Sequence, residues 1–233
     1  MNIFTKIVHL WQVRNSDAFI KSLRKKGIKI GTGCIIRHPR SARIDCSRPA
    51  LISIGNNVDI NKNFQILTHD WSSFVFRGLY NDFINSSGAV NIGSNIYFGT
   101  NVIILKGVSI GDNCIIGAGS IVSHDIPANS VAAGVPCKVI YPLEDYYKKR
   151  AKEGLLEAVE YVKAFQKRFG KDPYPKKITK EFIYFVNRNN IDKYESEGVP
   201  IKKQLDKAYD KWIENHKSIF NSFDAFMDYV NRQ

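Results

Sequence analysis

The chain has 233 residues, 44% of them hydrophobic, which is enough for a sizeable core in one or two domains. Its formal net charge is +12, but the Lys and Arg residues are scattered and form no aromatic-rich basic motif, which argues against nucleic-acid binding. No apolar run is long enough for a transmembrane helix, and the N-terminus lacks the apolar core and cleavage site of a signal peptide, so a cytoplasmic protein is expected.

Residues 1–27 are expected to form an N-terminal helical segment. The apolar residues of 2–13 recur with helical spacing, and a second helix is expected to begin at a cap on Asn15 or Ser16 and to end at Gly27. The first helix has two interpretations. It is either a lid packed on the solenoid or on a neighbouring subunit, which is the simpler interpretation, or an interfacial helix in peripheral contact with a membrane.

A repeat of six residues organises the chain between residues 28 and 142. A period of six fits neither a helix nor an alternating strand, and it predicts a parallel β-helix whose stacked coils share one apolar interior. The phase begins at Ile30 and is only partly kept over residues 37–53. The strictest part has a large apolar residue at every sixth position: Ile92, Phe98, Ile104, Ile110, Ile116 and Val122. Glycine follows four of these residues, at Gly93, Gly99, Gly111 and Gly117, where tight corners are expected to use its freedom at positive φ.

An insertion at residues 71–91 interrupts the repeat directly after His69 and Asp70. It is too aromatic for a disordered linker, and a long insertion in a compact repeat is usually functional or disordered. We therefore expect an ordered arm that covers a site or a neighbouring chain. Trp71 and Tyr80 could stack on a sugar ring or pack the arm, and Asp82 could bind sugar hydroxyls or be a solvated loop carboxylate.

The composition changes at Pro142, and the first Glu of the chain is Glu144. Residues 1–142 contain 15 Lys or Arg and seven Asp, a net charge of +8, while the remainder carries +4. Such a basic solenoid suits a polyanionic small ligand, an acidic glycan or an anionic membrane surface. Residues 143–233 are expected to form an α-helical C-terminal appendage without catalytic features.

The repeat, the arm, the histidine before it and the closing stretch GVPCKVI resemble the hexapeptide-repeat acetyltransferases. The similarity is greatest to the maltose, galactoside and nodulation-factor O-acetyltransferases and to those of cell-surface polysaccharides, and it covers roughly residues 28–142. It implies a mainly β fold, a left-handed parallel β-helix, a homotrimer, and acetyl-CoA bound along the coils between two subunits. We expect no metal site. The γ-class carbonic anhydrases share this fold but need three zinc-binding histidines, and His69 has no close second histidine and no partner pair elsewhere in the sequence.

Within this resemblance, His69 matches the catalytic histidine. We expect it to act as the general base that takes the proton of an acceptor hydroxyl. Its ring would be oriented by Asp70 or by a backbone carbonyl, and Asp70 could instead bind the acceptor. Thr100 is expected to supply the hydrogen-bond donor for the oxyanion.

The resemblance also implies a set of cofactor contacts. Gly99 and Thr100 match the corner at the thioester, Gly117 and Ala118 match contacts to the pantetheine arm, and Ser123 and His124 lie farther along it. Lys138 in GVPCK is expected near the nucleotide phosphates, where a cation is physically suitable.

The function that follows is transfer of an acetyl group from acetyl-CoA to a saccharide hydroxyl. The expected acceptor is a cell-surface polysaccharide such as capsule or O-antigen, or its precursor, and the expected location is the cytoplasm or the inner face of the membrane. Two alternatives stand beside this function. One is N-acetylation of an amino sugar or acetylation of an antibiotic, and the other is a non-catalytic β-helix used for assembly.

Overall fold

The computed structural model describes residues 13–233, so the first helix expected from the sequence lies outside the described residues apart from Val13. The described chain begins with helix α2 (Ser16–Lys25), which ends before Gly27 with its φ of +99°. The Asn15 side chain, one of the two caps considered from the sequence, caps the helix by accepting a hydrogen bond of 2.9 Å from the Ala18 N–H. Leu23 of this helix is buried with the core of the first coil.

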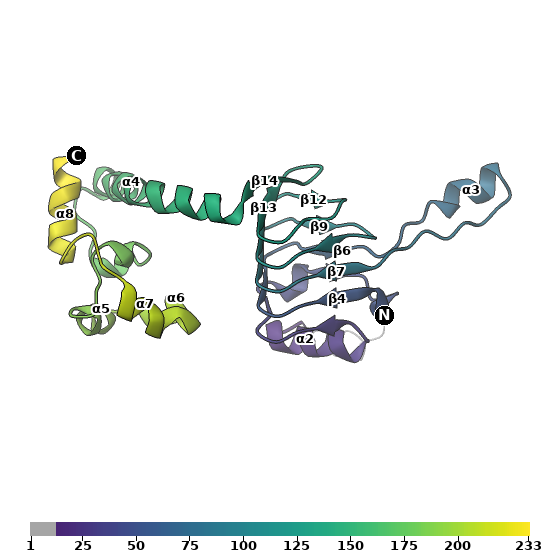
Figure 1. The fold of residues 1–233 in the computed structure, drawn as a ribbon, viewed down its shortest axis with the longest axis horizontal. Helices are drawn as coiled ribbons and strands as arrows, with labels where there is room; N and C mark the ends of the chain where they lie inside the picture. Colours follow the sequence, from purple (N-terminus) through teal and green to yellow (C-terminus); the bar gives the residue numbers. More distant parts are fainter. Residues whose placement is uncertain (1–12) are drawn as a thin grey trace. The chain divides into compact units, whose positions relative to one another are not determined.

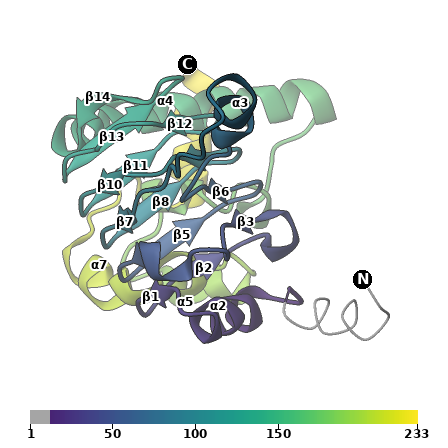
Figure 2. The same ribbon diagram turned by 90° about the vertical axis from the view of Figure 1, so that its right-hand side faces the viewer.

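The predicted parallel β-helix is confirmed, and its coils stack in three sheets that we name A, B and C (Figures 1 and 2). Sheet A contains, in spatial order, β1 (Lys29–Ile30), β4 (Ile52–Ile54), β7 (Val90–Ile92) and β10 (Ser109–Ile110). Sheet B contains β2 (Ile35–Ile36), β5 (Val58–Ile60), β8 (Ile96–Phe98), β11 (Cys114–Ile116), β13 (Ser130–Ala133) and β14 (Lys138–Pro142). Sheet C contains β3 (Arg43–Ile44), β6 (Gln65–Ile66), β9 (Ile103–Ile104) and β12 (Ile121–Val122). The chain therefore visits A, B and C once in each coil.

The leading apolar residues of the repeat stack inside the solenoid. In sheet C, for example, Ile44 pairs with Ile66, Ile66 with Ile104, and Ile104 with Val122. These side chains are buried, so each coil covers the apolar face of the next. The weakly patterned stretch 37–53 keeps this register, because two short 3₁₀ turns, Pro39–Ser41 and Pro49–Leu51, accommodate its additional residues.

The expected role of the corner glycines was wrong. The left-handed conformation is adopted mainly by asparagines, for instance Asn95 (φ 59°) and Asn113 (φ 58°), which hydrogen bond to each other at 2.8 Å across successive coils. Gly93, Gly99, Gly111 and Gly117 do not have positive φ. They are needed because the next coil approaches closely. A Cβ on Gly111 would lie 2.4 Å from Ala128 N and 2.7 Å from Ala128 Cα.

The inserted arm is ordered and carries the short helix α3 (Ser73–Leu79), which Figure 1 shows at its far end. Its base is a short antiparallel pairing: a bridge joins His69 and Ser87, and the Gly88 N–H donates to the Thr68 carbonyl at 2.9 Å. Beyond the arm, β7 resumes the stack with Ile92 paired to Ile54. The arm thus leaves and re-enters the solenoid at one corner, between sheets C and A.

The chain divides into two compact units, with the boundary between Tyr147 and Lys148. Helix α4 (Leu143–Phe169) is followed by α5 (Ile191–Ser196), α6 (Ile201–Leu205), α7 (Tyr209–Asn215) and α8 (Phe223–Arg232). The second unit has its own core, which includes Val162, Phe185 and Phe226. The single helical stretch expected over 200–230 is interrupted at Asp206, whose φ is +45°, and again before α8. No helix in the described part of the chain is long and apolar enough to span a membrane.

Candidate active site

His69 lies at the base of the arm and is paired with a carboxylate that the sequence did not indicate, that of Asp45. Asp45 directly follows strand β3, and His69 lies three residues after β6, the neighbouring strand of sheet C. Since Ile44 and Ile66 are in register, Asp45 lies one coil away from the residues that lead to His69. The distance from His69 Nδ1 to Asp45 Oδ2 is 2.7 Å, and the two side chains are 38% and 10% exposed.

The carboxylate of Asp45 accepts hydrogen bonds at both of its oxygens. Oδ1 accepts from the Ser47 N–H at 3.0 Å and from the Ser47 hydroxyl at 2.6 Å, and Oδ2 accepts from the Thr68 hydroxyl and from His69. Burial alone would raise the pKa of Asp45. The hydrogen bonds from Ser47, Thr68 and His69 together lower the pKa by more than burial raises it, so the pKa of Asp45 lies well below the ordinary range. Asp45 is therefore ionised in the folded protein.

An ionised carboxylate beside Nδ1 determines the tautomer of the neutral His69 ring. The carboxylate can only accept, so Nδ1 carries the proton and Nε2 is left as the acceptor nitrogen. A positive charge that forms on the ring is stabilised by the adjacent carboxylate. The pair has the properties of a general base whose orientation and tautomer are fixed.

Asp70, the neighbouring carboxylate, holds the arm and makes no contact with the ring of His69. Its Oδ2 lies 2.5 Å from Lys106 Nζ and accepts from the Ser86 hydroxyl at 2.8 Å. The Lys106 ammonium, with further help from the Ser72 hydroxyl and N–H, holds the pKa of Asp70 well below its usual range. Of the two ring partners considered from the sequence, Asp70 and a backbone carbonyl, the structure shows neither. Asp45 takes this position.

The candidate cofactor residues stack at the opposite edge of sheet C. Gly99 and Thr100 follow β8, and Gly117 and Ala118 follow β11, in adjacent coils of sheet B. The Gly119 N–H donates to the Thr100 carbonyl at 2.8 Å, which aligns Thr100 with Ala118. A Cβ on Gly99 would lie 2.5 Å from Ala118 N, so this corner is formed by closely packed backbone.

The remaining cofactor candidates lie at other positions of the last coils. Ser123 and His124 follow β12 at the corner between sheets C and A, with 3.0 Å between Ser123 Oγ and His124 Nδ1. Lys138 is the exposed first residue of β14, which pairs antiparallel with β13. His124 therefore lies on the same edge of sheet C as His69, whereas Thr100 and Ala118 lie on the other. One chain does not bring His69 and Thr100 together.

The candidate acceptor residues lie on the arm and are largely exposed. Trp71 and Tyr80 are 57% and 67% exposed, and the Trp71 ring meets that of Phe83 edge-on at 5.8 Å between centroids. The carboxylate of Asp82 accepts a hydrogen bond of 2.7 Å from the Phe83 N–H, within the arm itself. The structure thus places these residues on one projecting element, separate from the Thr100 corner.

Sequence analysis missed Asp45 and Lys106 for different reasons. Asp45 lies in the weakly patterned coil, where only the pairing of Ile44 with Ile66 reveals its place beside His69. Lys106 stands in an ordinary turn position of the repeat and meets Asp70 only because the arm returns to the same corner. Aligning successive coils would have placed Asp45 near Thr68.

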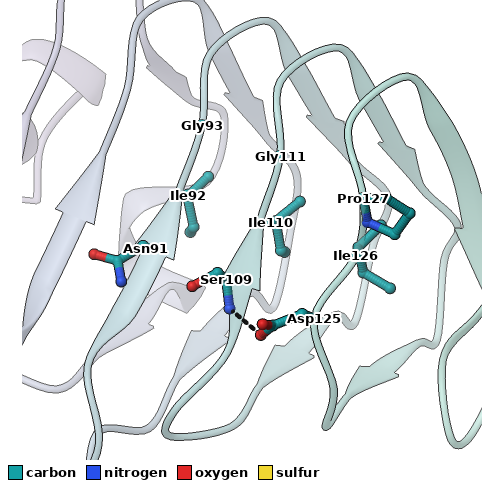
Figure 3. A pocket seen from close by; sticks show the side chains of 9 residues that line it. All are labelled: Asn91, Ile92, Gly93, Ser109, Ile110, Gly111, Asp125, Ile126 and Pro127. Carbon is teal, nitrogen blue, oxygen red and sulfur yellow. Dashed lines mark hydrogen bonds between the residues drawn. The ribbon is translucent and has the colours of Figure 1, made fainter.

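A shallow depression on the outer face of sheet A contains none of the candidate residues (Figure 3). It is lined by Asn91, Ile92, Gly93, Ser109, Ile110, Gly111, Asp125, Ile126 and Pro127. The carboxylate of Asp125 accepts a 2.7 Å hydrogen bond from the Ser109 N–H, which links two successive coils. Among residues 13–233 there is also no cluster of three or more His, Cys, Asp or Glu side chains that could hold a metal ion.

The sequence is similar to known proteins of one family. A family model described as "Bacterial transferase hexapeptide (six repeats)" matches residues 89–124. Protein CapG of Staphylococcus aureus is 38% identical over 176 residues, which cover 74% of this chain and 90% of CapG. Galactoside O-acetyltransferase of Escherichia coli K12 is 45% identical over 96 residues, or 40% of this chain, and the match spans less than half (45%) of that enzyme.

Among solved structures, a maltose O-acetyltransferase from Clostridium difficile 630 aligns with a TM-score of 0.41 and 29% identity, over 60% of this chain and 83% of that one. The match to CapG extends over nearly all of that relative, and the repeat matched by the family model forms the coils from β7 to β12. The chain belongs to the hexapeptide-repeat acetyltransferases, whose fold is the left-handed parallel β-helix.

Proposed function

We propose that the protein transfers an acetyl group from acetyl-CoA to a hydroxyl of a saccharide, with His69 as the general base. The observation that carries this proposal is the pairing of His69 with the ionised Asp45 at the base of the arm. The similarity to a galactoside O-acetyltransferase supports the reaction type. A cell-surface polysaccharide or its precursor is the acceptor that we favour.

In this reaction His69 Nε2 takes the proton of the acceptor hydroxyl while the hydroxyl oxygen attacks the thioester carbonyl carbon. The C–S bond then breaks, the acetyl group stays on the acceptor oxygen, and the imidazolium returns its proton to the departing CoA thiolate. The Asp45 carboxylate stabilises the imidazolium while the proton is held. Acetyl-CoA is supplied in the cytoplasm, which is where we place the reaction, either free or at the inner membrane face.

The backbone N–H of Thr100 is a suitable donor to the oxyanion of the intermediate. It makes no hydrogen bond to any described residue and stands at the close-packed corner beside Ala118. An N–H fixed in the backbone needs no reorganisation as negative charge develops, which is the property required of an oxyanion donor. From this corner, the candidate contacts to acetyl-CoA continue toward the last coils.

A homotrimer would supply what one chain lacks. His69 and Thr100 lie on opposite edges of sheet C, so a complete site needs the Thr100 corner of a second copy beside His69 of the first. The arm also exposes apolar side chains, including Phe74, Leu79 and Phe83, each more than 60% exposed. Packing of the arm against a neighbouring subunit would bury them.

The proposal is tested with the variant His69→Ala. Release of free CoA is followed with a thiol reagent during incubation with saccharide acceptors, and product mass confirms the transfer. The kcat should fall roughly 10²- to 10⁴-fold while acetyl-CoA affinity and the trimer mass in light scattering are preserved. A folded His69→Ala trimer with near-native kcat would refute His69 as the base.

Lys138→Ala tests the assignment of the nucleotide end. An exposed cation beside phosphate makes a charge-assisted contact that salt screens, so its loss should raise the KM for acetyl-CoA more than it lowers kcat. The KM is measured at low and at high ionic strength. A lower kcat with an unchanged KM would assign Lys138 elsewhere.

A further inference from the structure

Thr68, the residue before His69, places a hydroxyl in a fully buried position. The residue is 0% exposed, so water does not compete for this hydroxyl. The hydroxyl donates to Asp45 Oδ2, and Asp45 is its one hydrogen-bond partner in the described part of the chain. The Thr68 carbonyl accepts from the Gly88 N–H at 2.9 Å, at the base of the arm. Because an ionised carboxylate can only accept, the hydroxyl acts here as a donor.

The hydroxyl of Thr68 shares its acceptor oxygen with the ring of His69. The distance from His69 Nδ1 to the same Oδ2 is 2.7 Å, and the Thr68 N–H also reaches this oxygen, at 3.3 Å. The other oxygen, Oδ1, accepts from the N–H and the hydroxyl of Ser47. Thr68 therefore competes with His69 for one oxygen, whereas Ser47 holds the far side of the Asp45 carboxylate in place.

This sharing affects how firmly the carboxylate holds a proton on the His69 ring. Each donor draws the negative charge of the carboxylate toward itself, and the hydrogen bond from the Thr68 hydroxyl helps to lower the pKa of Asp45. A carboxylate that already accepts from Thr68 stabilises an adjacent imidazolium less than it would without that donor. A general base must be neutral when it takes its proton, so a weaker hold on the imidazolium favours catalysis near neutral pH.

Asp45 is the one charged group with an ion pair or hydrogen bond to His69 within residues 13–233. The other charged groups at this corner have partners of their own: Asp70 with Lys106, Arg48 with Asn85, and Lys26 with Cys46. The donors to Asp45 are therefore the contacts through which the charge beside the ring is adjusted.

We propose that Thr68 is a positioning residue whose hydroxyl weakens the hold of Asp45 on the proton of His69, so that the ring is neutral and basic near neutral pH. This inference rests on the proposed function. Removal of the hydroxyl leaves the carboxylate anchored, because both hydrogen bonds from Ser47 and the one from the Thr68 N–H remain. The effect is therefore on charge rather than on the placement of Asp45.

The test is Thr68→Val, which nearly keeps the shape of the side chain and removes the hydroxyl. The full chain is labelled with ¹³C-histidine and titrated by NMR, and the His69 signal is identified by its absence in His69→Ala. The pH–rate profile of acetyl transfer is measured on the same proteins. In Thr68→Val the pH at which the His69 ring is half-protonated should rise by about 0.5–1 pH unit, and the acidic limb of the pH–rate profile should move with it. The rate should fall about three- to tenfold on that limb and recover at alkaline pH.

Three further variants separate this effect from a loss of structure. Thr68→Ser keeps the hydroxyl and should titrate as the wild type does. Thr68→Ala removes the hydroxyl without adding apolar bulk and should give the same displacement as Thr68→Val. The matched control is Ser22→Ala, because Ser22 has another buried hydroxyl, which donates to the Phe19 carbonyl at 2.7 Å in helix α2. This control should lower the melting temperature without moving the titration or the pH–rate profile.

Two results would overturn the inference. One is a ring titration that is unchanged, or displaced to lower pH, in Thr68→Val and Thr68→Ala. The other is a titration displaced to higher pH with an unmoved pH–rate profile, in an enzyme that His69→Ala inactivates. A near-native kcat in His69→Ala would instead refute the proposed function. The NMR titration needs no turnover, so it would still decide whether Thr68 acts on the Asp45–His69 pair.

Discussion

Replacement of Asp45 by Asn tests how much of the activity depends on the carboxylate beside His69. The substitution keeps the size of the side chain but removes its charge and half of its acceptor capacity. In the wild type, Ser47, Thr68 and the His69 Nδ1–H all donate hydrogen bonds to the Asp45 carboxylate. An amide cannot accept from all of these donors, because its NH₂ group must point at some of them.

The expected loss follows from the geometry of the pair. Two unit charges about 4 Å apart attract each other by about 4 kcal/mol at an effective dielectric constant of about 20. The His69 side chain is 38% exposed, so solvent reduces this value toward the roughly 1.5–3 kcal/mol of a charged hydrogen bond. In the mechanism that we propose, the carboxylate stabilises the imidazolium formed in the transition state, and we therefore expect kcat to fall roughly 10- to 150-fold. The KM for acetyl-CoA should not change.

The assay is steady-state CoA release with the identified acceptor, together with thermal unfolding of each variant. The matched control is Asp112→Asn, because Asp112 also accepts a backbone hydrogen bond, at 2.6 Å from the Ser94 N–H, but lies away from His69. It should lose stability without a comparable loss of kcat. If Asp45→Asn kept kcat within about threefold of wild type while His69→Ala was inactive, the carboxylate would have no catalytic importance.

Three further outcomes are expected. Gly111→Ala should destabilise the protein by about 1–3 kcal/mol, because its Cβ would overlap the backbone of the next coil. Gly78→Ala should not lower the melting temperature, because an added Cβ there meets nothing beyond the backbone of its own helix. Lys106→Met should leave the melting temperature nearly unchanged, because its ion pair with Asp70 is exposed to solvent, but it should speed amide exchange at the base of the arm. Unchanged exchange would contradict this role. Hydrogen bonds lower the pKa of Asp45 in the folded state. The ionised Asp45 carboxylate therefore stabilises the fold fully above the ordinary Asp pKa of about 4, and this contribution is lost as the pH falls. In thermal melts, Asp45→Asn should lose less stability on acidification below pH ~4 than the wild type does.

The sequence predicted the features that repeat or are local. The six-residue period identified the apolar residues that stack inside the coils, such as Ile92. The capping residues Asn15 and Ser16 located the start of α2 to within one residue. The aromatic residues of the insertion indicated an ordered arm. All of these follow from side-chain periodicity or from contacts within a few residues in the chain.

Features created by contacts between coils were not predicted. The glycine after each leading residue was assigned to a local need, positive φ, whereas the actual constraint at Gly111 is the backbone of the next coil. The partner of His69 was sought among its neighbours in the chain, but Asp45 is 24 residues away and adjacent only through the stacking of β3 and β6. In a solenoid such distant pairs depend on the register, and a single irregular coil conceals it.

The two ends of the solenoid determine whether the coils can join with those of another molecule. A stack of parallel strands presents unpaired N–H and C=O groups at each end, and a second stack could continue it indefinitely. In sheet B the direction of pairing reverses at β14, so the last strand of this sheet no longer matches the first coil of another copy. Helix α2 covers β1 and β2 at the opposite end. The reversed strand of sheet B and the helix over β1 and β2 both oppose end-to-end joining of copies, and so oppose the growth of fibrils.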